Sequence, residues 1–328
     1  IDFNNPPAKA QEIISAGDVP LGTQGNLFGI TGGEGTGKSN YVAAIVAGCI
    51  CPAGAEVDTL GVQITANGRH KAVLLYDTEQ SEVQLFKNVS NLLIRAKQPD
   101  KPDELKAFCL TGMSRKERLH AIVQSMDKFY YQYGGIQLVV IDGIADLVKS
   151  ANDEAESVAV IDELYRLAGI YNTCILCVLH FVPNGLKLRG HLGSELQRKA
   201  ATILSIEKDE EPAQSVVKAL KVRDGSPLDV PLMLFAWDKE AGMHVYKGEK
   251  TREEKEKRKE RELVNVARDI FGRQTRITYI DLCEQLQQVL DIKERTAKSY
   301  IRFMRERDII TKDTANQSFF VIGSYNLQ

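Results

Sequence analysis

The sequence lacks a hydrophobic run long enough to cross a membrane. Its longest apolar stretches, LVVIDGIADLV and CILCVLHFV, are well short of the roughly 20 residues that a spanning helix requires. No charged segment followed by an apolar one opens the chain, as it does in a secretory signal. We therefore expect a cytoplasmic protein with no membrane contact. The chain begins with Ile1 rather than Met, which fits a sequence cut from a longer polypeptide.

The sequence also lacks an excess of one charge and the paired cysteines of a zinc site. Its 42 lysines and arginines oppose 44 aspartates and glutamates, giving a formal net charge of -2. Any binding of nucleic acid must therefore come from local basic patches. The cysteines do not have the spacing of zinc ligands, so we expect them to be reduced and buried. They are Cys49, Cys51, Cys109, Cys174, Cys177 and Cys283.

The composition is that of an ordinary globular protein, with 43% hydrophobic and 26% charged residues. A chain of 328 residues exceeds the roughly 250 that one hydrophobic core usually holds, so we predict two domains. The segment GEKTREEKEKRKERE is almost wholly charged and reads as a linker or a solvated helix. The predicted organisation is a large domain over 1–248, a charged linker over 249–262 and a small domain over 263–328.

The large domain alternates short β-branched runs with helical patterns, which predicts βαβ units and an α/β fold. The runs are almost continuously apolar, as in a mostly parallel sheet covered on both faces. The clearest strands are NLFGIT, AVLLYDT, AFCLTG, IQLVVID and TCILCVLH. After Ala200, turn residues separate ATILSIEKDE, QSVVKALKVRDG and VPLMLFAW, which we read as antiparallel strands added to one edge.

The small domain follows the order helix, helix, helix and then two short strands joined by a charged turn. In its third helix Ala297, Ile301 and Met304 recur at helical spacing and are expected to face the core. Basic residues fall within one arc on the opposite side. They are Arg295, Lys298, Arg302 and Arg305.

A complete G-x-x-x-x-G-K-[ST] motif follows the first long apolar strand and precedes a helical run. The glycines let backbone N–H groups and the helix N-terminus point at the phosphates of a nucleotide. Lys38 would neutralise the β- and γ-phosphates and Ser39 would ligate Mg²⁺. The predicted phosphate-binding residues are Gly32, Gly33, Glu34, Gly35, Thr36, Gly37, Lys38, Ser39 and Asn40.

Two further strands end in carboxylates that such a site needs. IQLVVID ends in Asp142, which we assign to the metal because a P-loop uses a carboxylate on a neighbouring strand. AVLLYDTE ends with Glu79, the candidate general base for the attacking water. Asp77 is the competing candidate, and both acids could instead cap the helix that begins near Ser81.

With these motifs in order, the sequence resembles the RecA-like ATPases, and within them the ring-shaped replicative helicases of the DnaB and RepA type. The likeness covers roughly Val19 to Trp237. It implies a RecA-like fold that uses ATP and Mg²⁺, with Glu79 as the catalytic acid. It also implies that His180, which ends the strand after the Asp142 strand, senses the γ-phosphate; a histidine with only a structural role is the alternative.

The segment VKALKVRDGSPLDVPLMLF resembles the family's Lys-x-Arg-x-Gly segment, which reaches the nucleotide of the adjacent subunit. Lys221 and Arg223 take those roles by this likeness, and the forked donors of arginine suit charge developing on a γ-phosphate. A site completed by a neighbour implies a homo-oligomeric ring, expected to be a hexamer. The alternative is two basic residues on the solvated face of a strand.

Two segments are candidates for DNA contact. FVPNGLKLRGHLGS resembles the channel loop that holds single-stranded DNA in this family, with Lys187 and Arg189 as phosphate contacts. The small domain resembles the winged-helix domains of plasmid and phage replication proteins. Its basic helix could contact duplex DNA through Arg295, Lys298 and Arg302, or it could dock a protein.

Three functions follow from the resemblance. The favoured one is an ATP-dependent DNA helicase or translocase that acts in replication of a plasmid or mobile element. The absence of the N-terminal collar of DnaB, and His180 where DnaB commonly has glutamine, favour this RepA-like branch. The second is a DNA-binding ATPase switch that regulates or loads partners without unwinding. The third is a RecA-like recombinase or a KaiC-like signalling ATPase.

Overall fold

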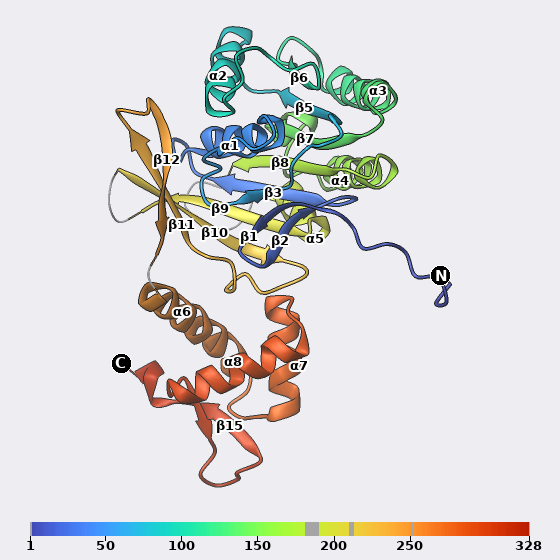
Figure 1. Ribbon diagram of the computed structural model, residues 1–328. Helices are drawn as coiled ribbons and strands as arrows, with labels where there is room; N and C mark the ends of the chain where they lie inside the picture. Colours follow the sequence, from blue (N-terminus) through green and yellow to red (C-terminus); the bar gives the residue numbers. More distant parts are fainter. Residues whose placement is uncertain (1, 181–189, 210–212, 251, 328) are drawn as a thin grey trace. The chain divides into compact units, whose positions relative to one another are not determined.

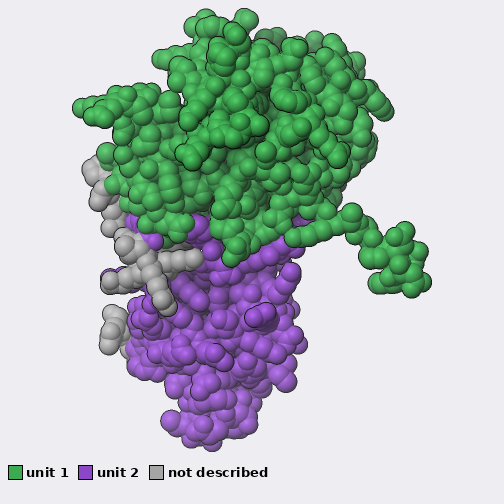
Figure 2. Space-filling view, in the orientation of Figure 1, with its two compact units in different colours: residues 1–221, 232–249 green, residues 222–231, 250–328 purple. Residues whose placement is uncertain are grey.

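The computed structural model describes residues 2–180, 190–209, 213–250 and 252–327. They form two compact units (Figure 2). The first contains Ile1–Lys221 and Leu232–Glu249, and the second contains Val222–Pro231 and Lys250–Gln328. The last of the three boundaries between the units, after Glu249, lies at the start of the charged segment. Residues 222–231 group with the second unit, whereas the sequence alone places them in the large domain.

A nine-stranded sheet with the order β12-β11-β10-β9-β3-β8-β7-β5-β6 forms the centre of the first unit (Figure 1). The five strands expected from the apolar runs are all present, and each pairs in parallel with its neighbours among the five. Every residue of β3 and β5 is buried. The five are β3 (Leu27–Gly32), β5 (Ala72–Asp77), β6 (Leu105–Cys109), β7 (Ile136–Asp142) and β8 (Cys174–His180).

Four more strands extend the sheet on the other side of β3. They are β9 (Thr202–Lys208), β10 (Gln214–Val222), β11 (Met233–Asp238) and β12 (Met243–Glu249). The pairs β10–β11 and β11–β12 are antiparallel, as predicted. The prediction is wrong for β9, which pairs in parallel with β3. The reason is helix α5 (Gly190–Lys199), which supplies the crossover that a parallel strand requires.

Helices cover both faces of this sheet, with α1 and α2 on one face and α3 and α4 on the other (Figure 1). The apolar side chains of α3, α4 and α5 share one core with the strands. Side chains at Ser81 and Asp153 cap α2 and α4 by accepting backbone N–H bonds. The bounds are α1 Lys38–Ile50, α2 Glu82–Arg95, α3 Arg115–Tyr133, η1 Ile144–Leu147 and α4 Glu154–Ile170.

A smaller three-stranded sheet with the order β2-β1-β4 also belongs to the first unit. Its strands are β1 (Glu12–Ala16), β2 (Val19–Thr23) and β4 (Gln63–Ile64). Throughout the part of the chain that the structure describes, no helix combines the length and apolar character needed to span a bilayer.

The cysteines are all free, and four of the six are buried. The prediction that all six are buried is wrong for Cys51 and Cys109, which are half-buried. Cys51 directly follows the last residue of α1, and Cys109 ends β6 at the margin of the sheet. Both therefore have fewer neighbours than a residue inside an element.

In its described residues, the second unit contains three α-helices and a three-stranded sheet with the order β13-β15-β14. Ala297, Ile301 and Met304 are buried as predicted. Most of the charged segment forms the first turns of α6, so it is helical rather than an extended linker. The elements are α6 Arg252–Phe271, β13 Ile277–Thr278, α7 Tyr279–Leu290, α8 Glu294–Glu306, β14 Ile310–Lys312, β15 Phe319–Ile322 and η2 Ser324–Leu327.

Truncation of two neighbouring side chains on α8 should change the stability of the second unit by very different amounts. Ile301 is 1% exposed whereas Arg302 lies on the exposed face, so Ile301→Ala leaves a cavity in the core of the second unit. We expect Ile301→Ala to destabilise this unit by about 2–5 kcal/mol and Arg302→Ala to have little effect. Hydrogen exchange of α8 amides in the whole chain measures both, and equal effects would contradict this burial pattern.

Candidate active site

Four strand ends meet at one edge of the large sheet, because β3, β8, β7 and β5 are parallel neighbours. Gly32 of β3 pairs with His180 of β8, and Asp142 of β7 pairs with Asp77 of β5. The carboxyl ends of parallel strands are where ligands bind in open α/β sheets. Residues that are far apart in the sequence are thus brought to one place.

The loop between β3 and α1 has the backbone geometry of a phosphate cradle. Gly35 and Gly37 have φ values of 67° and 93°, in the left-handed region that favours glycine. A Cβ on Gly37 would also lie 2.8 Å from a ring carbon of Phe235. Helix α1 begins at Lys38, and no described side chain caps its N-terminus. Its first N–H groups are therefore available to an anion.

Lys38 lies inside this loop. Its Nζ donates hydrogen bonds to the carbonyl oxygens of Gly32 (3.0 Å) and Gly33 (2.6 Å), and the residue is only 7% exposed. Burial lowers the pKa of Lys38, whereas the negative charges of Asp142 and Glu79 act to raise it. The cation is thus held between the loop carbonyls and the carboxylates, and it can bind the phosphates that enter the loop.

Asp77 and Glu79 differ in what their side chains do. Asp77 is 2% exposed, and its Oδ1 accepts the backbone N–H groups of Glu79 (3.0 Å) and Gln80 (2.8 Å). Burial raises the pKa of Asp77, and these hydrogen bonds act to lower it. Asp77 therefore shapes the turn after β5. Glu79 is more exposed, and its Oε2 lies 3.2 Å from Nε2 of His180.

Thr78 ties the ends of β5 and β7 together. Its hydroxyl donates to the carbonyl oxygens of Asp142 (3.0 Å) and Gly143 (2.7 Å). Gly143 has a φ of 97°, and a Cβ there would lie 2.4 Å from the Thr78 hydroxyl and 2.6 Å from Cγ of Glu79. A side chain at position 143 would therefore displace Glu79.

The negative charge of Asp142 is unfavourable in this site. Burial, followed by the charges of Asp77 and Glu79, raises the pKa of Asp142 to about 7, and His180 and Lys38 oppose this shift. A carboxylate in this position gains from an added cation. Within the described residues, no three His, Cys, Asp or Glu side chains form a metal site by themselves. Mg²⁺ with a nucleotide needs few protein ligands, because phosphate and water oxygens complete its shell. Ser39 and Asp142 fit that requirement.

One of the two predicted trans-acting cations, Lys221, lies apart from this edge. Lys221, on β10, donates to the carbonyl oxygens of Gln197 (2.8 Å) and Arg198 (3.2 Å), at the C-terminal end of α5 where a cation is favourable. Arg223 is exposed and belongs to the second unit.

The predicted DNA contacts belong to two separate segments of the chain. Lys187 and Arg189 are outside the described residues, whereas residues 190–194 of the same predicted loop belong to α5. Arg295, Lys298 and Arg302 are exposed on α8. Lys298 pairs with Glu294 at 2.7 Å, and this contact raises the pKa of Lys298.

Residues 1–184 match the family model described as AAA domain. The match covers more than half of the 328-residue chain. The chain belongs to the AAA domain family. This assignment makes it a P-loop ATPase of the RecA-like superfamily, with the phosphate loop, Glu79, Asp142 and His180 inside the matched residues. The family match ends before Lys221 and Arg223. No curated protein matches the sequence.

Two substitutions in the AAA domain distinguish between the candidate bases Glu79 and Asp77. Glu79→Gln removes the proton acceptor, and we expect hydrolysis to fall about 10²- to 10⁴-fold while nucleotide binding persists. Asp77→Asn keeps an oxygen that can accept the two turn N–H groups, so it should retain far more activity. Single-turnover hydrolysis and nucleotide binding measure both. A larger loss for Asp77→Asn would make Asp77 the base.

The raised pKa of Asp142 has a consequence for stability. Below a pH of about 7 the carboxyl is protonated in the folded chain, and above it the buried charge is unfavourable relative to the unfolded chain. Asp142→Asn removes this charge. We expect the variant to melt at a higher temperature than the parent at pH 8. The difference should shrink as the pH falls below about 7 and should vanish only below about 3.8, the ordinary pKa at which the unfolded chain also becomes protonated. Thermal unfolding without Mg²⁺ or nucleotide measures the difference, and a gain that grows toward low pH would contradict the assignment.

Proposed function

We propose that the chain is an ATP-dependent DNA helicase or translocase that acts in replication of a plasmid or mobile element. The observation that carries this proposal is the position of His180. It is the last residue of β8 and contacts Glu79, and the predicted DNA segment begins at the next residue. The end of β8 therefore contacts Glu79 and is followed in the sequence by the segment proposed to hold single-stranded DNA.

In the proposed reaction, Lys38 and the N-terminal amides of α1 bind the phosphates of ATP. Ser39 and Asp142 would hold Mg²⁺, which would supply positive charge to the phosphates. Glu79 accepts the proton of the attacking water, and His180 senses the γ-phosphate. The approach of Glu79 to His180 at 3.2 Å supports a shared role for these two side chains.

The direction of β10 supports completion of the site by a second subunit. Asp209, just beyond β9, donates its N–H to the carbonyl of Gln214, so β10 begins near the edge that holds the P-loop. Lys221 comes seven residues later on the same strand. At about 3.3 Å per residue it lies roughly 23 Å along the strand from that edge. Lys221 is therefore too far to serve its own nucleotide. A ring, with six subunits expected, would bring Lys221 and Arg223 to a neighbour's site.

A DNA-binding ATPase switch is the second candidate, and the second unit supports it. Its three helices and the strands β14 and β15 follow the predicted order, with the additional short strand β13 between α6 and α7, and Arg295, Arg302 and Arg305 are exposed on α8. Such a unit could hold duplex DNA while nucleotide controls assembly, without any unwinding.

Hydrolysis of ATP with and without single-stranded DNA, together with opening of a forked duplex, tests the proposal. We expect DNA to stimulate hydrolysis and the duplex to open. Lys38→Ala should neither bind nor hydrolyse ATP, and Arg223→Ala should bind ATP without hydrolysing it. Mixing Arg223→Ala with Glu79→Gln should restore part of the activity, because some interfaces then contain an intact Glu79 and an intact Arg223.

Two results would change the proposal. Hydrolysis that ignores DNA, with no duplex opened, would favour the switch. No recovery of activity in the mixture would show that Arg223 does not act on a neighbouring subunit.

A further inference from the structure

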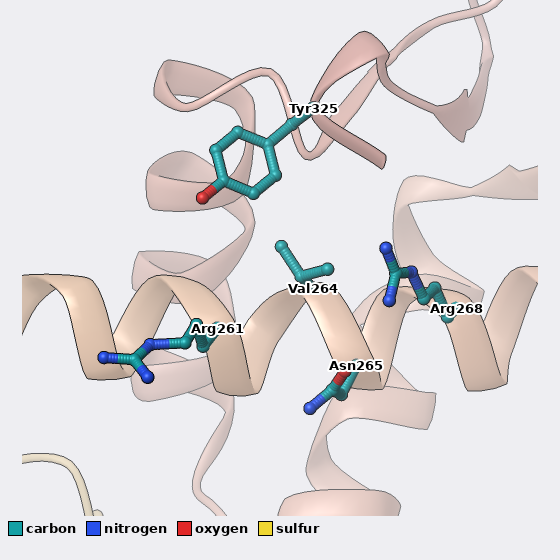
Figure 3. A pocket seen from close by; sticks show the side chains of 5 residues that line it. All are labelled: Arg261, Val264, Asn265, Arg268 and Tyr325. Atoms are coloured by element: carbon teal, nitrogen blue, oxygen red, sulfur yellow. The ribbon is translucent and has the colours of Figure 1, made fainter. Parts of the chain in front are cut away.

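A pocket of about 360 Å³ lies within the second unit, between helix α6 and the turn η2 near the end of the chain (Figure 3). Its size falls in the range of about 300–1,000 Å³ that is typical of ligand sites. It belongs neither to the P-loop site nor to the basic face of α8. Its lining residues are Arg261, Val264, Asn265, Arg268 and Tyr325.

One face of α6 forms the floor of this pocket. Positions 261, 264, 265 and 268 recur at helical spacing and so share that face. Val264 is 6% exposed, whereas Arg261 and Arg268 are exposed. Figure 3 shows the two guanidinium groups on either side of Val264, with the ring of Tyr325 across from it. The pocket is thus apolar and aromatic at its centre and basic at both ends.

The guanidinium groups of Arg261 and Arg268 have no hydrogen-bond or ion-pair partner among the residues whose side chains the structure describes. Acidic side chains of the same helix serve another arginine: Arg307 contacts Glu256 at 3.0 Å and Glu260 at 3.9 Å. Asp269 follows Arg268 directly and points about 100° around the helix from it. Two cations without internal partners at one pocket favour an anionic ligand.

Tyr325 is held in place by the turn that carries it. The N–H of Gly323 donates to the carbonyl of Ile309 at 2.8 Å, and the N–H of Tyr325 donates to the carbonyl of Asp308 at 3.2 Å. The hydroxyl of Ser324 donates to the Asp308 carboxylate at 2.6 Å. A Cβ on Gly323 would lie 2.0 Å from the Asp308 carbonyl oxygen, so glycine permits this close approach. The backbone that carries the aromatic ring is therefore fixed before any ligand arrives, which lowers the cost of binding.

We propose that this pocket binds single-stranded DNA, with Arg261 and Arg268 on two phosphates and Tyr325 against a base between them. The arginines are anchored seven residues apart, about 10 Å along the helix axis, and their head groups do not meet at one point (Figure 3). This spacing suits separate phosphates better than a single one. Proteins bind single-stranded nucleic acids through aromatic rings beside basic groups, because the faces of unpaired bases are free to stack on the rings. The inference rests on the proposed function only in taking DNA as the ligand.

Fluorescence anisotropy with a labelled oligothymidylate tests the pocket in the full chain. We expect Arg261→Gln with Arg268→Gln to weaken binding about tenfold or more and to reduce the slope of log affinity against log salt by about 1.4. Tyr325→Ala should weaken binding about fivefold or more. Arg273→Gln is the matched control, since Arg273 is exposed in the same unit and does not line the pocket. Thermal unfolding checks that each variant folds.

A second measurement locates the contact directly. Iododeoxyuridine-substituted single strands, irradiated with the full chain, should crosslink to the peptide that contains Tyr325, and the double arginine variant should lose this crosslink. The proposal is overturned by a double variant with unchanged affinity and salt slope, by crosslinks that map elsewhere, or by an equal loss of duplex binding. Displacement of DNA from the parent chain by ATP, but not from the double arginine variant, would make a free nucleotide the ligand. Failure of the motor function is distinguishable, because DNA would then bind without stimulating hydrolysis.

Discussion

The parallel register of β3, β8, β7 and β5 is the constraint on which the rest of the site depends. It sets Asp77 directly opposite Asp142, so two carboxylates end neighbouring strands and Glu79 follows within two residues. Burial makes this grouping unfavourable and raises the pKa of Asp142 to about 7. Lys38 and His180 offset part of the negative charge. The negative charge that remains favours a further cation, and a bound Mg²⁺ would supply that positive charge.

The features that local sequence encodes were predictable, and those that depend on distant contacts were not. The P-loop and the buried strands follow from short patterns, because glycine spacing and apolar runs are local. The direction of β9 was missed because its crossover helix α5 is short and mostly polar, with few apolar positions such as Leu192 and Leu196. The packing of Phe235 against Gly37 and the position of Tyr325 beside Arg261 join segments far apart in the chain, and no local pattern signals either.

The directions of β9 and β10 decide which of their residues lie near the P-loop. Because β9 continues the parallel ladder, its end lies beside the P-loop, where Ile206 pairs with Gly32. Because β10 then turns back, it carries Lys221 away from that edge. A cation on β10 could serve the site of its own chain only near the start of the strand. The proposed role of Lys221 in hydrolysis therefore requires a second subunit.

Hydrogen bonds fix the backbone around Glu79, whereas its side chain is partly exposed. Asp77 holds the turn after β5 through two backbone N–H groups, and Thr78 joins that turn to the end of β7. The backbone that carries Glu79 is thus tied on both sides, whereas its side chain is 33% exposed and contacts His180. A displacement at the end of β8 would move His180 relative to a fixed backbone and so change the environment of the Glu79 carboxylate. In the proposed function, DNA held by the segment that follows β8 would act on hydrolysis through this displacement.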